Sequence, residues 1–154
     1  MKLYVKQKAL TLGDTFSVID ETGADLYTVK GSALRKLKLT DTDKKEIAVL
    51  KRNSFSVAPC YVLKRNGQKV AKIKMRVTGN KYSVKGLGWT VKSDLLLRTF
   101  TLKDGLKEIA EAGKKALSIG DSYEFEIKEG IDTVNALMVL IAVDACLEIS
   151  TGKK

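Results

Sequence analysis

VNALMVLIAV, residues 134–143, is apolar at every position except Asn135. Asp132 precedes it at the position of a helix N-cap, and Asn135 three residues later forms a weak capping-box pattern. A helix from Asp132 to Glu148 would be roughly 26 Å long. It would be apolar on nearly every face, and such a helix must be buried. Because Asp144 comes early for a membrane span, we expect a buried core helix rather than a transmembrane one.

The chain before this segment, up to about residue 128, consists of short alternating stretches separated by turn signals. Thr15–Ile19 alternates in this way, and Asn66-Gly67 is a strong two-residue hairpin signal. The spacing of about eight to twelve residues per strand predicts an antiparallel sandwich or barrel of about twelve strands. The window Leu106–Ala112 also fits a helical face, so a helix there is the alternative.

An internal repeat relates the two halves of this β-rich part. A shift of 62 positions places Tyr27–Lys30 on Trp89–Lys92 and Lys45–Ala48 on Lys107–Ala110. About ten of roughly 37 aligned positions are identical, where chance would give about three. Neither half has its own core helix and no linker separates them. We therefore expect one domain over residues 1–154, in which two similar half-shells close around one helix.

Four segments resemble a known family and together span nearly the whole chain: Leu3–Lys8, Phe16–Gly23, Ser118–Ile127 and Ala136–Ala145. With two repeated β halves before an apolar helix, the chain resembles the LURP-one-related family. That family has the tubby C-terminal-like fold and is related to the phospholipid scramblases. The resemblance implies a mainly β fold, a closed barrel of about twelve strands around a central buried C-terminal helix.

The resemblance implies little about activity, because bacterial members of the family have no established one. Tubby proteins bind phosphoinositides through basic side chains on the barrel. No local motif of this chain matches that site, so no residue is carried over. The Pro-rich N-terminal segment and the acylated cysteine cluster of the scramblases are also missing from this sequence.

Composition argues against several kinds of chemistry. The chain has no histidine, which removes the commonest general base and the commonest metal ligand. Cys60 and Cys146 are too few for a disulfide framework or a zinc site, so we expect two reduced thiols. Met1–Lys6 has no apolar core of a signal peptide. We expect a cytoplasmic protein without cofactor or metal that is not an enzyme.

Positive charge is concentrated in the middle of the chain, whose net charge is +10. Between Glu46 and Asp94 there is no acidic residue but there are eleven basic ones. In Lys72-Ile73-Lys74-Met75-Arg76 the basic residues alternate with apolar ones, so they would share the outer face of a strand, roughly 7 Å apart. The predicted hairpin would bring two further cations beside this ridge. The candidate anion-binding residues are Lys64, Arg65, Lys72, Lys74 and Arg76.

Three interpretations of this charge remain open. Outward lysines can serve only solubility in a structural or protein-interaction protein. They can bind anionic phospholipid headgroups, at about 1 kcal/mol for each basic side chain near the membrane. They can also bind nucleic acid, but single-strand binders need aromatic stacking platforms. Only Tyr61, Tyr82 and Trp89 adjoin the basic stretch, and Trp89 is expected to pack inward. The sequence therefore favours lipid headgroups over nucleic acid, with peripheral attachment to the membrane.

Asp144 is the most unusual single residue, because a carboxylate within an apolar helix must be paired or protonated. We expect it near the barrel mouth, within reach of a lysine. Glu124 and Glu126 share one face of a strand and are expected to be solvated rather than catalytic. An enzyme or carrier with its ligand inside the barrel would require a cavity, which the apolar helix should fill.

Overall fold

The computed structural model describes residues 1–5, 15–32, 36–76, 80–94, 96–97, 99–117 and 120–150. These residues form twelve β-strands followed by one α-helix. The elements are β1 (Lys2–Val5), β2 (Thr15–Ile19), β3 (Asp25–Ser32), β4 (Lys36–Thr40), β5 (Glu46–Arg52), β6 (Cys60–Arg65), β7 (Gln68–Met75), β8 (Lys81–Lys85), β9 (Trp89–Asp94), β10 (Thr99–Asp104), β11 (Lys107–Leu117), β12 (Gly120–Ile127) and α1 (Thr133–Ser150).

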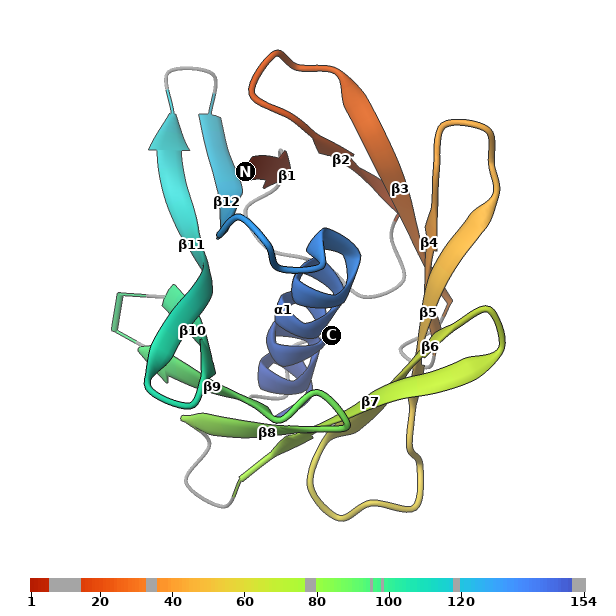
Figure 1. The fold of residues 1–154 in the computed structure, drawn as a ribbon, viewed down its shortest axis with the longest axis vertical. Helices are drawn as coiled ribbons and strands as arrows, with labels where there is room; N and C mark the ends of the chain where they lie inside the picture. The colour runs from red at the N-terminus through yellow and green to blue at the C-terminus, as the bar shows by residue number, and fades with distance from the viewer. Residues whose placement is uncertain are drawn as a thin grey trace.

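The strands form one closed antiparallel barrel, in which each strand pairs with the next one in the sequence. The barrel closes through β1, which pairs with both β12 and β2 (Figure 1). The amino group of Met1 donates a 2.8 Å hydrogen bond to the carbonyl of Ile127 at this closure. Closure removes the exposed strand edges that an open sheet would present to other chains. The predicted mainly β barrel of about twelve strands is therefore confirmed.

Alternation along each strand separates core from surface. On β7, for example, Ala71, Ile73 and Met75 are buried, whereas Lys74 between them is exposed. The Asn66-Gly67 hairpin is confirmed, because both residues have positive φ angles, 53° and 74°, as a two-residue type I′ turn requires.

The repeat corresponds to a displacement of six strands around the barrel. Tyr27–Lys30 lies on β3, and its counterpart Trp89–Lys92 lies on β9. In the same way Glu46 opens β5, and the matching Glu108 lies near the start of β11. The helical alternative for Leu106–Ala112 is wrong, because this segment enters β11.

The helix α1 lies inside the barrel (Figure 1). Val134 and every residue from Ala136 to Cys146 are buried. The N–H of Asn135 donates a 2.9 Å hydrogen bond to Oδ1 of Asp132, so Asp132 is the predicted N-cap. By length and composition alone α1 could cross a bilayer, but 67% of its residues are buried by the barrel. This burial is what the sequence predicted for a core helix, which here ends at Ser150.

The meander gives the barrel two distinct ends. The connections β2–β3, β4–β5, β6–β7, β8–β9, β10–β11 and β12–α1 lie at one end, which we call the turn end. The described parts of the other connections, residues 53–59, 76, 80 and 96–97, lie at the opposite end, the loop end. Thus α1 begins at the turn end, and its C-terminus points towards the loop end.

Candidate functional site

Eight lysines occupy outward positions on six consecutive strands, β4 to β9. Each alternates with residues that the barrel buries, so its side chain lies on the outer surface. We call this set the lysine face: Lys36, Lys51, Lys64, Lys72, Lys74, Lys81, Lys85 and Lys92. Lys38 is excluded because its Nζ forms an ion pair of 3.4 Å with Oε1 of Glu46.

Strand register places members of the lysine face directly opposite one another. Lys36 is opposite Lys51 on β4 and β5. The register also pairs Lys72 with Lys85, and Lys81 with Lys92. Like charges directly opposite one another destabilise an antiparallel sheet. The site therefore holds positive charge at a cost in folding free energy.

Three of the five predicted anion-binding residues lie together on this face. Lys72 and Lys74 are two residues apart on β7, and Lys64 lies on the adjacent strand β6. Arg76 is exposed just beyond the end of β7, where its N–H donates a 2.9 Å hydrogen bond to the carbonyl of Lys81. The predicted ridge on β7 therefore exists, with Arg76 at its end.

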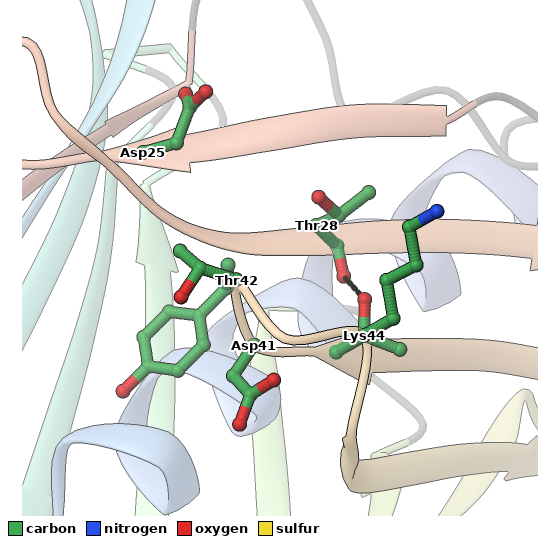
Figure 2. A pocket seen from close by; sticks show the side chains of 7 residues that line it. Asp25, Thr28, Asp41, Thr42 and Lys44 are labelled. Carbon is green, nitrogen blue, oxygen red and sulfur yellow. Dashed lines mark hydrogen bonds between the residues drawn. The ribbon is translucent and has the colours of Figure 1, made fainter.

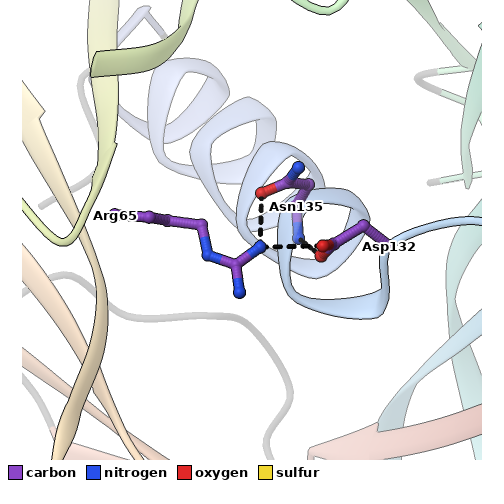
Figure 3. A network of polar contacts seen from close by, with 3 residues as sticks. All are labelled: Arg65, Asp132 and Asn135. Atoms are coloured by element: carbon purple, nitrogen blue, oxygen red, sulfur yellow. Dashed lines mark hydrogen bonds and ion pairs between the residues drawn. The ribbon is translucent and has the colours of Figure 1, made fainter. Parts of the chain in front are cut away.

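Arg65 does not lie beside the ridge, contrary to the prediction. As the residue next to Lys64 on one strand, it points to the opposite side of the sheet. Its Nη1 donates hydrogen bonds to Oδ2 of Asp132 at 2.9 Å and to Oδ1 of Asn135 at 3.1 Å (Figure 3). Arg65 therefore anchors the N-terminus of α1 to the hairpin between β6 and β7.

This contact also sets the ionisation of the helix cap. Burial by itself would raise the pKa of Asp132. The hydrogen bond from the N–H of Asn135 and the guanidinium of Arg65 outweigh this effect and lower the pKa below its usual value. Asp132 is thus held as a carboxylate at the turn end.

A group of exposed apolar residues lies at the loop end and was not singled out in the sequence. Phe55 and Val57 are fully exposed in the connection between β5 and β6. Leu96 and Leu97 are exposed in the connection between β9 and β10. The available signal was large apolar residues within segments otherwise typical of turns.

A surface hollow of about 290 Å³ lies beside Phe55. Its lining includes Lys51 and Lys64 of the lysine face, together with Asn53 and Ser54. Arg52 also lines it, so the hollow combines three cations with short polar side chains and one exposed aromatic ring. This combination suits an anionic group attached to an apolar one.

A second hollow, of about 350 Å³, lies at the turn end between β3 and the β4–β5 turn (Figure 2). The hydroxyl of Thr40 donates to the carbonyl of Thr28 across it, at 3.5 Å. Oδ1 of Asp41 accepts the N–H groups of Asp43 and Lys45, both at 2.9 Å. These contacts hold the turn together, so we assign the hollow a structural role.

The barrel interior contains several buried polar groups, including Asp144 and the two cysteines. The hydroxyl of Tyr123 donates a 3.0 Å hydrogen bond to Oδ1 of the buried Asp144. A lysine partner for Asp144 stays a prediction.

Cys60 and Cys146 are buried free thiols, as predicted. Burial raises the pKa of the Cys146 thiol, which disfavours the reactive thiolate. Among the described residues, no cluster of three His, Cys, Asp or Glu could hold a metal ion.

Comparisons with known proteins agree with this architecture. The sequence model of the LURP-one-related family matches residues 1–144. The uncharacterized protein YxjI of Bacillus subtilis is 29% identical over 152 residues, covering 96% of this chain and 94% of that protein. An X-ray structure of a protein from Arabidopsis thaliana superposes with a TM-score of 0.67. It is 16% identical and covers 93% of this chain and 88% of its own, and this likeness shows the fold alone.

Proposed function

We propose that this chain, which belongs to the LURP-one-related family, is a non-catalytic module that binds anionic phospholipid headgroups. The binding surface would be the lysine face, and attachment would be peripheral, at the cytoplasmic side of a membrane. The observation that carries the proposal is the direct opposition of Lys72 to Lys85 and of Lys81 to Lys92. A phosphate placed between two opposed lysines would replace their repulsion by two attractions.

The expected strength is that of a reversible contact. Each lysine near an anionic bilayer contributes about 1 kcal/mol. Four or five engaged lysines would give about 4 to 5 kcal/mol, and salt would weaken this attraction. The lysine face has eight members, so one orientation of the barrel can engage this number without any change in the fold.

Positions of the aromatic residues favour lipid over single-stranded nucleic acid. Tyr61 and Tyr82 are buried in the core, and Trp89 packs against it. None of these three rings is therefore available on the lysine face as a stacking platform for bases. Phe55 is exposed beside Lys51, but one ring can stack only one base, whereas single-strand binders use several such rings. The exposed aliphatic side chains at the loop end suit a bilayer better than a polynucleotide.

The charge of β7 provides the direct test. Replacing Lys72→Glu together with Lys74→Glu should abolish cosedimentation with vesicles that contain phosphatidylserine, because it reverses the centre of the lysine face. The matched control is Lys107→Glu with Lys128→Glu, which changes net charge equally. Lys128 lines a hollow with Glu108, Glu111 and Glu126 on the other side of the barrel. This control should retain most of the binding.

The competing interpretations give different results in the same assay. Equal sedimentation of the unaltered protein with phosphatidylserine vesicles and with pure phosphatidylcholine vesicles would exclude headgroup recognition. If both double variants lost vesicle binding equally, net charge alone would explain the binding and the lysine face would have no specific role. Tighter binding to a single-stranded oligonucleotide than to either vesicle would favour the nucleic-acid function instead.

A further inference from the structure

Large apolar side chains are presented to solvent from two connections at the loop end. The β5–β6 connection exposes 98% of Phe55 and all of Val57. The β9–β10 connection exposes Leu96 and Leu97. Single exposed apolar residues are common on protein surfaces. Two pairs, each on a protruding connection at the same end of one barrel, form a more specific pattern.

Hydrogen bonds fix the β5–β6 connection in this position. Oδ1 of Asn53 accepts the N–H of Phe55 at 3.1 Å, and the N–H of Asn53 donates to the carbonyl of Cys60 at 2.9 Å. The N–H of Met75 donates to the carbonyl of Pro59 at 3.1 Å. The connection is thus tied to β6 and β7 and projects outward at the bottom of Figure 1. Its backbone presents Phe55 to solvent without needing to rearrange.

The β9–β10 connection is built in a similar way. Oδ1 of Asp94 accepts the N–H groups of both Leu96 and Leu97, each at 3.0 Å. This side-chain bridge holds a turn that presents the two leucines. The alternation of strand direction places this turn at the same end of the barrel as Phe55.

Cations of the lysine face lie along one side of the same end, on β4 to β9. Five of them lie within two residues of a strand terminus at the loop end: Lys36, Lys51, Lys74, Lys81 and Lys92. The hollow beside Phe55 lies among them and is lined by Lys51. An apolar tip with cations behind it matches the layers of an anionic bilayer, in which acyl chains lie beneath phosphates.

We propose that the loop end is the membrane-facing end, and that Phe55 and Val57 insert between lipid acyl chains. The hollow behind Phe55 then receives the phosphate of a headgroup, with Lys51 and Lys64 among its cations. This inference rests on the proposed function and adds to it an orientation and an apolar anchor. A second copy of the chain is a poor occupant, because it would bring lysines against lysines.

Tryptophan fluorescence tests the orientation directly. Trp89 is the one tryptophan of the chain, so Trp89→Phe provides a silent background. In that background, Phe55→Trp should show a blue-shifted emission with phosphatidylserine vesicles and quenching by brominated acyl chains. Leu106→Trp is the matched control, because Leu106 is also 98% exposed but lies at the turn end. It should show neither effect.

The outcomes separate the two proposals. If the protein sediments with anionic vesicles but the emission of the Phe55→Trp variant does not change, insertion is wrong and the headgroup proposal survives. If the protein does not sediment with anionic vesicles, the proposed function fails and the inference fails with it. An emission shift in the Leu106→Trp variant would reverse the orientation and overturn the inference. An emission shift in the Phe55→Trp variant without vesicles, at high protein concentration, would show self-association instead.

A second variant measures the contribution of the anchor. Phe55→Ser with Val57→Ser should weaken binding to phosphatidylserine vesicles by roughly tenfold or more, because two apolar side chains no longer leave water. Both positions are exposed, so folding should be unaffected, and circular dichroism will check this. The salt dependence of binding should remain, since the lysines are unchanged. An unaltered affinity would contradict insertion.

Discussion

Asp132 acts twice at the N-terminus of α1. Its Oδ1 caps the helix by accepting the N–H of Asn135, and its Oδ2 accepts the guanidinium of Arg65 from the β6–β7 hairpin. One carboxylate thereby joins the first turn of the core helix to the wall of the barrel. Exposed ion pairs contribute up to about 1 kcal/mol, and N-caps contribute about 0.5 to 2 kcal/mol.

Asp132→Asn separates these two roles, because asparagine is an equally good N-cap but cannot form the ion pair. At pH 7 we expect a loss of up to about 1 kcal/mol in the free energy of unfolding, measured with urea. The folded state lowers the pKa of Asp132 below 3.8. The contribution of the charge is therefore present above about pH 4 and disappears as the pH falls through the lowered pKa.

The difference between the two proteins should accordingly shrink as the pH falls below about 4 and through the lowered pKa of Asp132. Arg65→Gln should show the same pH dependence but also loses the bond to Asn135, so the double variant should lose no more than Arg65→Gln alone. A difference that grows in acid would show that the carboxylate is not stabilised by folding.

Arg65 also shows why part of the site could not be predicted from the sequence. Its partner Asp132 lies 67 residues away, and no local pattern indicates that contact. The basic character of the stretch was visible, and the outward direction of Lys72 and Lys74 followed from alternation. The opposition of Lys36 to Lys51 depends on strand register, which a bulge at Ile47 of β5 shifts and which the sequence does not reveal.

At the scale of elements, β11 explains the one ambiguous secondary-structure prediction. The pairing of β10 with β11 shifts at Leu102, so Ile109 becomes an extra residue next to Ala110. Both are buried, although they are neighbours in one strand. With Leu106 this gives the spacing of a helical face in the sequence. The core helix was easier to predict from the sequence, because a helix that is apolar on nearly every face must be buried.

Gly86 fixes how the β8–β9 turn packs. Its φ angle is +101°, and a Cβ there would lie 2.4 Å from the carbonyl oxygen of Val70 on β7. Gly86→Ala should therefore destabilise the barrel by about 2 to 4 kcal/mol, through backbone strain and overpacking. Gly88 in the same turn has φ +69° but open space around it. Gly88→Ala should cost only about 1 to 2 kcal/mol.

Urea unfolding measures the loss of unfolding free energy in each alanine variant. Gly88→Ala reports backbone strain alone, whereas Gly86→Ala reports strain together with the steric contact to Val70. Equal losses would mean that the turn moves away from β7 at little cost. A larger loss in Gly88→Ala would contradict the packing seen at Gly86.

At the scale of the whole molecule, the barrel and the helix depend on each other. A helix buried from Ala136 to Cys146 needs a complete shell, and the closed shell needs something to fill its interior. Outward-facing side chains therefore do not need to be apolar, because the core is formed by the helix and the inward-facing side chains. The outer surface can carry opposed lysines, whose repulsion the packed interior offsets.

A barrel with a packed interior and an outer surface of opposed lysines should become more stable as the salt concentration rises. With a net charge of +10 and directly opposed lysines, repulsion across the barrel should weaken as the Debye length falls from about 30 Å at 0.01 M to about 8 Å at 0.15 M. The melting temperature should rise by about 2 to 4 °C for each 1 kcal/mol of relieved repulsion. Thermal unfolding at the two salt concentrations measures this rise.

A single lysine of the opposed pairs locates the source of the effect. Lys72→Gln removes one member of the pair with Lys85, so it should raise the melting temperature in low salt, with a smaller gain in high salt. Lys107→Gln should give no such gain, because Lys107 lies opposite Asp104. If Lys72→Gln melts lower than the unaltered protein in low salt, the lysine face is not under electrostatic stress. The argument that a bound anion would relieve that stress then loses its basis.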